Sequence, residues 1–447
     1  MYKQLFCALQ KAARYEGIIM KYNIQLTPEQ TDVLNGKKGE TMAKVMETLV
    51  MFGDIFGVKR MVEVTHKEGH LVTSFGIGLL KPLYKTMDRL IADGIKTQGT
   101  FTVDPRPLDR ENVKYSLLDR LVNEKIMYSQ QKHYEDQLKA VGLKDANAFT
   151  CACYLDEVGN IPKKGDILSW AESSAVVYAN SVLGARCNRN SGMLDLFGSI
   201  VGCVPEFGLL TDEGRKATWI VKVETTKIPE AQILGSAIGM KVVEDVPYVY
   251  GLDKWIGSEL TDEAKGYLKD FGAATASNGA VGLYHIDNLT PEAKELGEKL
   301  IVENPKVYVI DDAELERVYK SYPNMWKKPD SKATMAFVGC PHLTFTQLNE
   351  WTDMIENALK QSGKKKVALQ TIICSAPDVV AKFKKTPAYN RLVATGAKLT
   401  SICPLMYTNN PLTKGKSIAT CSNKLRTYSI ARYYKTADLL NIIAGKE

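Results

Sequence analysis

The last third of the chain alternates short apolar segments with helical patterns, and this alternation restricts the possible folds more than any other feature. The apolar segments have the length and composition of strands, and we expect the first of them to be buried. They are Lys306–Asp311, Thr334–Val338, Val367–Ile373 and Lys398–Ile402. Strands that alternate with helices form a parallel sheet with right-handed crossovers. We therefore predict an α/β fold whose ligands bind outside the carboxyl ends of the strands.

Helix-start signals support the helical part of this prediction. Thr27 and Gln30 have the spacing of a capping box, and Pro28 between them suits the first helical position. Thr344 and Gln347 repeat the capping pattern after the second predicted strand. A helical pattern also covers residues 42–56. The order of elements between there and about residue 280 does not follow from periodicity.

Cysteines gather where the predicted strands end. Cys340 and Cys403 follow the second and fourth strands, Cys374 closes the third, and Cys421 ends a possible strand at residues 417–420. One interpretation is that they are small buried hydrophobic residues. The alternative is a shared site, because thiolates favour zinc or an iron–sulfur cluster. The spacing fits no zinc ribbon or finger.

Composition excludes several classes of protein. The chain has 447 residues, enough for two or three domains, and its net charge of +7 is spread over 58 basic and 51 acidic residues. No nucleic-acid module accompanies the lysine cluster near residue 365, so we expect no nucleic-acid partner. No apolar run reaches membrane-spanning length. The nine scattered cysteines suit a reducing compartment, and we expect a cytoplasmic protein.

Several long motifs resemble one known family. The segment Trp170–Arg189 contains Trp-Ala-Glu-Ser-Ser-Ala-Val and ends in Gly-Ala-Arg-Cys-Asn-Arg, and Gly339–His342 reads Gly-Cys-Pro-His. With the Cys151–Leu155 segment, these motifs resemble the aconitase X family. The resemblance implies an aconitase-like, multi-domain α/β fold with parallel sheets flanked by helices. We expect an N-terminal helical extension over residues 1–24, an α/β region over 25–300 and a C-terminal α/β domain over 301–447.

The resemblance also implies chemistry. Family members are hydro-lyases that hold an iron–sulfur cluster through three cysteines, and the matching positions are Cys151, Cys340 and Cys403. Cys153 is the second choice for the first position, while Cys374 and Cys421 are expected to be packing residues. The chain resembles the large subunit alone, which implies a small swivelling-domain subunit as partner. The proton-abstracting base is then expected on that partner.

Other residues of the family motifs are candidates for catalysis and for substrate binding. Glu172, Ser173 and Ser174 are the predicted catalytic residues, at the start of a predicted helix whose N–H groups attract anions. The predicted substrate-binding residues are Asn180, Arg186, Asn188, Arg189, His342 and Lys424. Each also has a plain structural interpretation, because serine caps helices, glutamate suits a first turn, and basic residues suit helix ends or the surface.

The substrate implied by the resemblance is a small hydroxy acid. Known family members act on cis-3-hydroxy-L-proline, which we expect first, or on mevalonate 5-phosphate. Two loops, Leu71–Phe75 and Thr102–Pro107, depart from the family pattern, so a different substrate stays open, and Arg106 suggests either an added anionic group or an exposed side chain. A cluster-bearing regulatory or nucleic-acid-binding protein is the alternative of another class. Retention of Glu172, Arg186 and Arg189 argues against it.

Overall fold

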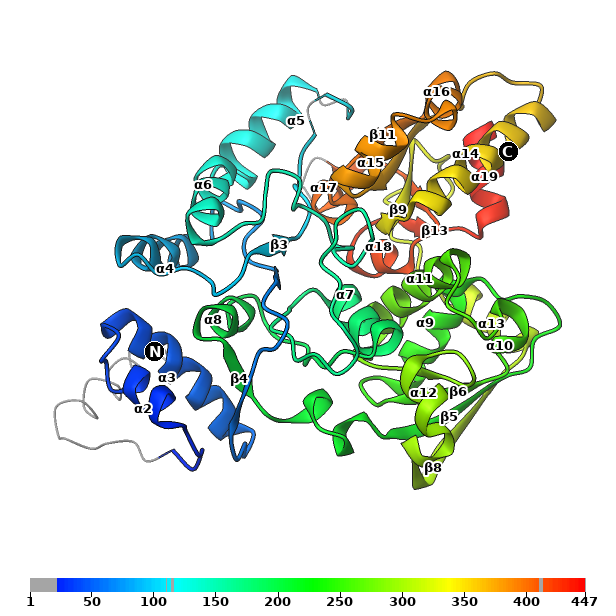
Figure 1. Ribbon diagram of the computed structural model, residues 1–447. Coiled ribbons are helices and arrows are strands. Elements are labelled where there is room, and N and C mark those ends of the chain that lie inside the picture. The colour runs from blue at the N-terminus through cyan, green and yellow to red at the C-terminus, as the bar shows by residue number, and fades with distance from the viewer. Residues whose placement is uncertain (1–21, 110, 114–115, 410–412, 447) are drawn as a thin grey trace.

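The computed structural model describes residues 22–109, 111–113, 116–409 and 413–446 (Figure 1). The expected helix of the N-terminal extension lies outside the described residues. The described chain forms three consecutive parts, and α7 (Ser173–Tyr178) lies near the centre of the picture, where they meet. Within these residues, no helix is long and apolar enough to cross a membrane.

The first part consists of helices around two pairs of short strands. Thr27 caps α2 with the predicted capping box, and the predicted helix over residues 42–56 is confirmed as α3. Strands β2 and β3 pair in parallel, whereas β1 and β4 pair antiparallel. The elements are α2 (Pro28–Leu34), α3 (Glu40–Ile55), β1 (Met61–Glu63), β2 (Gly69–Leu71), α4 (Lys81–Ala92), β3 (Phe101–Val103), α5 (Leu117–Val122), α6 (Gln131–Val141), α8 (Leu194–Val201) and β4 (Cys203–Pro205).

The second part is a parallel sheet in the order β7-β6-β5-β8. Its elements are β5 (Ala217–Val223), α9 (Ala231–Val242), β6 (Pro247–Tyr250), α10 (Asp253–Ile256), α11 (Asp262–Asn278), β7 (His285–Ile286), α12 (Pro291–Leu296), β8 (Ile301–Ile310) and α13 (Asp312–Lys320). The first predicted strand is part of β8, but the expectation that it is buried is wrong. Because β8 is an edge strand, Val307 and Val309 are 55% and 45% exposed. The expected domain boundary at residue 300 falls within this sheet.

Helices α9 and α11 pack closely because small residues line their contact. A Cβ atom on Gly235 would lie 2.3 Å from the carbonyl oxygen of Phe271, and one on Gly239 would lie 2.6 Å from that of Thr275. Only glycine permits this approach of the two backbones. Helix α11 also contacts α7 and α18 (Asn423–Tyr428), so this packing supports elements from all three parts.

The third part confirms the predicted parallel sheet, in the order β11-β10-β9-β12-β13. Its strands are β9 (Met335–Leu343), β10 (Gln370–Ser375), β11 (Lys398–Thr400), β12 (Ile418–Thr420) and β13 (Arg432–Tyr433). Its other helices are α14 (Phe345–Gln361), α15 (Pro377–Phe383), α16 (Pro387–Ala394), α17 (Pro404–Thr408) and α19 (Thr436–Ala444). Thr344 caps α14 as predicted.

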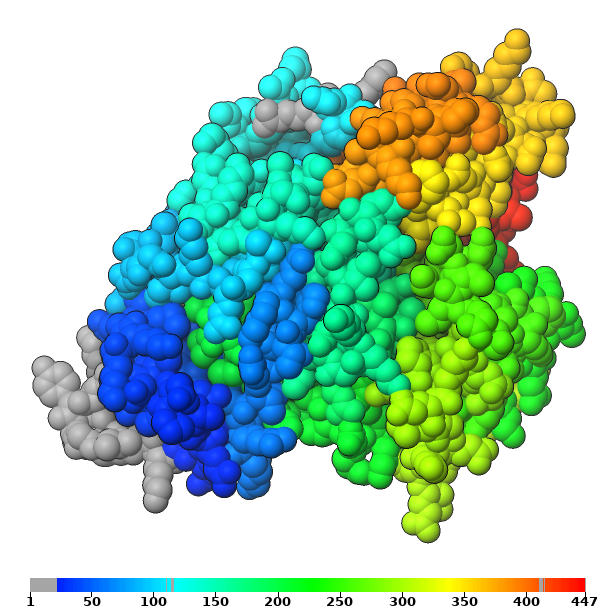
Figure 2. All heavy atoms as spheres, in the orientation of Figure 1, coloured from blue at the N-terminus to red at the C-terminus, as the bar shows by residue number. Residues whose placement is uncertain are grey.

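The third predicted strand begins three residues later than expected. The N–H groups of Val367 and Ala368 bond to the carbonyls of Thr395 and Ile443, at the ends of α16 and α19, rather than to a neighbouring strand. The space-filling view places the teal central segment between the blue first part and the green and orange parts (Figure 2). This central segment includes the Glu-Ser-Ser motif.

Candidate active site

The end of β9 bulges out of its sheet and carries the first of the candidate thiols. Ile373 of β10 lies opposite Val338 and Ser375 lies opposite Leu343, so the four residues 339–342 have no partners in the register. Gly339 makes the bend possible with a φ of +94°, where a Cβ atom would lie 2.2 Å from the carbonyl oxygen of Cys374. The bulge therefore presents Cys340 and His342 at the carboxyl end of the sheet.

Two further cysteines lie near Cys340. Cys403 is the N-cap residue of α17, directly after β11, and Cys151 accepts a hydrogen bond at Sγ from the His342 N–H group, at 3.4 Å. Burial raises the pKa of both thiols, and a charge on Cys340 raises each pKa further. The hydrogen bond from His342 and the position of Cys403 after β11 place the three predicted cluster cysteines in one region, at the carboxyl end of the sheet.

The cysteines in this region differ in how far their side chains are exposed. Cys151 and Cys403 are half-buried, whereas Cys153 and Cys374 are completely buried. Burial is also the main cause that raises the pKa of Cys374, followed by the charges of Cys340, Cys403 and Cys151. Cys374 is therefore close to the other thiols but sits inside the sheet. A cysteine that faces a ligand needs an open side, which Cys151 and Cys403 have.

His342 joins the three segments that carry these cysteines. Its Nε2 atom donates to the carbonyl oxygen of Ile402 at 3.1 Å, because a carbonyl only accepts. Its Nδ1 atom then accepts from the hydroxyl of Thr150, at 3.0 Å. Both partners precede a candidate cysteine by one residue, and His342 itself lies two residues after Cys340. Burial lowers the pKa of His342 to about 4, so the ring is neutral at neutral pH.

A buried ion pair connects the Glu-Ser-Ser motif to the C-terminal part of the chain. Lys424 Nζ donates to Glu172 Oε1 and, at 3.1 Å, to the hydroxyl of Ser174. Ser174 in turn donates to Glu172 Oε2 at 2.6 Å. Burial acts to raise the pKa of Glu172, but Lys424 outweighs it and the pKa is lowered. Burial acts to lower the pKa of Lys424, yet Glu172 raises it, so both groups are ionised.

The start of α7 differs from the expected anion site. Glu172 is the N-cap residue, and its Oε2 atom accepts the N–H group of Ala175 at 2.6 Å. The free helix N–H groups predicted to attract a substrate are therefore bonded in part by the protein's own carboxylate. The cation beside this helix start is Lys424, which carries three protons on Nζ and uses two of them for Glu172 and Ser174.

Two more titratable groups surround this ion pair. Burial lowers the pKa of His70 to about 4. The charge of Glu172 opposes this shift, and the charge of Lys424 adds to it. Burial raises the pKa of Asp104, which the charge of Glu172 raises further and that of Lys424 opposes. Asp104 also raises the pKa of Cys403, after burial and Cys340. His70 and Asp104 thus both interact with the ion pair, and Asp104 also interacts with the thiols.

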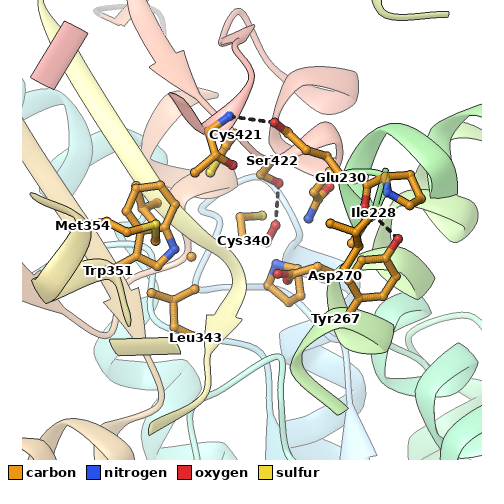
Figure 3. A pocket seen from close by; sticks show the side chains of 17 residues that line it. Ile228, Glu230, Tyr267, Asp270, Cys340, Leu343, Trp351, Met354, Cys421 and Ser422 are labelled. Carbon is orange, nitrogen blue, oxygen red and sulfur yellow. Dashed lines mark hydrogen bonds between the residues drawn. The ribbon is translucent and has the colours of Figure 1, made fainter. Parts of the chain in front are cut away.

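A pocket of about 300 Å³ borders the β9 bulge (Figure 3). Its lining includes Cys340, Cys421, Glu230, Tyr267 and Asp270. The Ser422 hydroxyl donates to the Cys340 carbonyl within it. Cys421 therefore lines a neighbouring pocket, and its nearest titratable groups are Asp270 and Glu230.

The chemistry of the three thiols indicates which metal group they suit. Among the described residues, no three His, Cys, Asp or Glu side chains form a group that holds a metal ion. The described cysteines are all free of disulfides. Thiolates suit both zinc and iron–sulfur clusters, and the sequence spacing of these cysteines fits no zinc ribbon or finger, so their chemistry suits a cluster better than a zinc ion.

Models of one family cover most of the chain. The first, second and third domains of aconitase X match residues 23–213, 217–320 and 333–442. The chain belongs to the aconitase X family. This confirms the resemblance inferred from the sequence motifs.

The aconitase X relatives are dehydratases. The phosphomevalonate dehydratase large subunit of Thermococcus kodakarensis is 31% identical over 341 residues, which are 76% of this chain and 78% of that protein. The large subunit from Methanothermobacter thermautotrophicus is 30% identical over 383 residues, 85% of this chain and 87% of that protein. The cis-3-hydroxy-L-proline dehydratase of Pseudomonas aeruginosa is 28% identical over 255 residues, 56% of this chain and 41% of that protein. The chain is thus an enzyme of the hydro-lyase class.

The fold agrees with a solved aconitase X structure. The crystal structure of the holo form of Thermococcus kodakaraensis aconitase X matches with a TM-score of 0.76 and 28% sequence identity. The match covers 93% of this chain and 99% of that one. The predicted aconitase-like α/β class, with parallel sheets flanked by helices, is confirmed.

Four predicted substrate residues of this aconitase X protein lie apart from the Glu172–Lys424 pair. Asn180 uses its whole amide, donating to the carbonyls of Cys187 and Gly282 and accepting from Cys187 N and Arg215. Arg186 donates to the carbonyl of Leu210 and to Asp212. Asn188 bonds to the backbone of Phe207 and Leu209. Arg189 is exposed beside Glu244. Their partners are structural, so their role in binding substrate stays a prediction.

Other predicted residues have mixed outcomes. Ser174, Lys424 and Glu172 converge, while Ser173 is half-buried at the start of α7. The ring of His342 is taken up by Thr150 and Ile402, which suits positioning rather than direct contact with substrate. Arg106 pairs with Glu135 through two hydrogen bonds of 2.9 and 3.0 Å, so its charge is neutralised within the protein.

Sequence reasoning missed His70 and Asp104 as site residues. His70 was given no role, and Asp104 was noted only as part of a loop that departs from the family pattern. The signal that was available is an Asp-Pro pair directly after an apolar segment, Phe101–Val103, which marks a strand end. A polar residue at the carboxyl end of a strand is a typical site residue.

Proposed function

We propose that the protein is the large subunit of a two-chain dehydratase that removes water from a small hydroxy acid at an iron–sulfur cluster. The observation that carries this proposal is the convergence of Cys151, Cys340 and Cys403 beside the Lys424–Glu172 ion pair. The curated archaeal relatives are named as large subunits, which supports a small subunit as the partner. Neither the cluster nor the partner is part of the structure.

Cys151, Cys340 and Cys403 would hold the cluster through their thiolates. When bound, such a cluster supplies an iron without a protein ligand, which acts as a Lewis acid toward a substrate oxygen. Lys424 then lowers the cost of placing thiolates here, because its charge opposes the rise that burial causes in the pKa of Cys340. The donor set and the charge of its surroundings both suit an electron-rich metal group.

Lys424 binds the substrate carboxylate in this proposal. Two of its ammonium protons bond to Glu172 and Ser174, and the third is directed to the substrate. Glu172 holds Lys424 in place and keeps it charged, and Ser174 fixes the second carboxylate oxygen. Ser173, at the open start of α7, supplies a further hydroxyl donor. The base that removes the carbon-bound proton is assigned to the small subunit.

The substrate is one of two candidates. We expected cis-3-hydroxy-L-proline from the resemblance, and curated dehydratases of that substrate are among the relatives. Phosphomevalonate is the second candidate, because the relatives that match the chain at 30–31% identity, and over more of their own length, carry that name.

The test is purification under anaerobic conditions, together with a small-subunit gene encoded near this one. We expect a brown protein with bound iron and sulfide that dehydrates one of the two candidate substrates. Iron and sulfide are measured by chemical analysis and the product by its new double bond. A colourless protein without iron under these conditions would overturn the cluster, and a brown protein without activity on either acid would overturn the substrate assignment.

A further inference from the structure

His70 and Asp104 stand side by side at the ends of two paired strands. β2 and β3 run parallel with His70 opposite Thr102, and the N–H group of Asp104 bonds to the carbonyl of Leu71 at 3.2 Å. Residues 102 and 104 point to the same face, because side chains alternate along extended chain. The side chain of Thr102 contacts His70, so Asp104 lies on that same face. The backbone of His70 also bonds to Ala171 N, next to Glu172.

Each of the two side chains has one buried polar atom without a hydrogen-bond partner among the described residues. These atoms are His70 Nε2 and Asp104 Oδ1. His70 is completely buried, whereas Asp104 is half-buried. Buried polar atoms in native proteins are nearly always bonded, and an unbonded one in an active site indicates a ligand or a water. Two unbonded atoms on the same face indicate one shared occupant.

Both unbonded atoms are acceptors. The hydroxyl of Thr102 donates to the carbonyl of Gly69 at 3.4 Å, so it accepts from His70 Nδ1 at 2.9 Å. A neutral imidazole that donates from Nδ1 carries a lone pair on Nε2. Asp104 Oδ1 accepts when the carboxyl group is ionised, which is the form that a nearby positive charge favours. An occupant that satisfies both needs two protons on one atom or on adjacent atoms.

The charges around the pair select the kind of occupant. Asp104 and Glu172 are both carboxyl groups, and Lys424 is already paired with Glu172. A phosphate dianion has no proton to donate and would meet two carboxyl groups. A protonated amine has protons for both acceptors and a charge opposite to that of Asp104.

We propose that His70 and Asp104 form a subsite that binds the protonated amine of the substrate, beside the carboxylate held by Lys424. This inference rests on the proposed function and narrows its substrate class to hydroxylated amino acids. Asp104 is a specificity residue: it accepts from the amine and opposes a phosphate.

The test measures binding by calorimetry on the cluster-loaded protein with its small subunit. The probes are cis-3-hydroxy-L-proline, the same ring acid with oxygen in place of nitrogen, and phosphomevalonate. We expect the amine to bind at least about tenfold more tightly than the oxygen ring, about 1.4 kcal/mol. Asp104→Asn should remove this preference.

Asp136→Asn is the matched control, because Asp136 is an exposed carboxylate paired with Lys132. It should leave the preference unchanged. Equal affinity for the two rings in wild type, an unchanged preference in Asp104→Asn, or no binding of the amine would each overturn the subsite. Tighter binding of phosphomevalonate would overturn it as well, while dehydration of phosphomevalonate would leave the proposed reaction intact.

Discussion

The Nε2 atom of His342 lies 3.1 Å from the carbonyl oxygen of Ile402, so one imidazole ties the bulge of β9 to the residue before Cys403. The other ring nitrogen bonds to Thr150, the residue before Cys151. The three candidate cysteines come from sequence positions up to 252 residues apart (403 − 151). Their common location therefore depends on contacts such as these, more than on any one loop.

We predict that His342→Phe lowers the iron content of the purified protein to well under half that of wild type. The phenylalanine removes the acceptor of the Thr150 hydroxyl proton and the donor to the Ile402 carbonyl, which destabilises the cluster-free protein by about 2–4 kcal/mol. Iron analysis and urea unfolding measure the two effects. His342→Gln keeps an N–H donor for Ile402 and should recover part of the iron. The exposed His133→Gln is the control, and full iron loading of His342→Phe would contradict the positioning role.

We predict that Lys424→Met abolishes activity and destabilises the protein by about 3–5 kcal/mol, because it leaves the Glu172 carboxylate buried without its cation. Glu172→Gln alone leaves Lys424 without its anion and should also destabilise. The double variant should lose less stability than the sum of the two, which a double-mutant cycle in urea measures. The exposed pair Lys132–Asp136 is the control, with no measurable coupling expected. Additive losses for Lys424 and Glu172 would show that the pair is not coupled in solution.

Patterns within a few residues predicted local structure well. The capping boxes at Thr27 and Thr344 are both present, because a cap depends only on residues three apart. Glu172 and Lys424 entered as separate candidates through family motifs. That they touch depends on α11, which holds α7 against α18, and no local pattern shows this.

The pairing of His70 with Asp104 was beyond the sequence for a related reason. It depends on the register of two three-residue strands, which are too short for periodicity to detect. The sequence also does not show which partners Arg186 and Arg189 have in the fold. Arginine side chains can bind a substrate carboxylate or a carboxylate of the protein, and the sequence does not distinguish the two. In the fold, Asp212 lies beside Arg186 and Glu244 lies beside Arg189.

Cysteine substitutions are predicted to separate ligands from packing residues. Cys151→Ala, Cys340→Ala and Cys403→Ala should each remove the visible absorption of the cluster, since each supplies one thiolate. Cys374→Ser and Cys153→Ser should keep it, although a buried hydroxyl in their place lowers stability by about 1–3 kcal/mol. Absorption spectra and iron content of anaerobic samples decide this. Cys187→Ser is the control for a buried cysteine, and loss of the cluster in Cys374→Ser alone would make the ligand assignment wrong.

Buried histidines predict how stability depends on pH. Burial lowers the pKa values of His70, His285 and His342 to about 4, from a usual value of 6.5. Between these two pH values the unfolded chain binds protons that the folded chain does not, so the free energy of unfolding falls as pH drops from 6.5 toward 4. Each histidine contributes up to about 1.4 kcal/mol per pH unit within this window.

His285→Gln tests this contribution because glutamine keeps an N–H group for the carbonyl of Arg215 but does not titrate. We expect urea unfolding of the cluster-free variant, measured from pH 7.5 to 4.5, to show a slope smaller than that of wild type by about 1 kcal/mol per pH unit. His133→Gln is the control for the removal of an exposed histidine side chain. Identical slopes for His285→Gln and wild type would mean that His285 takes up a proton in the folded state as readily as in the unfolded chain.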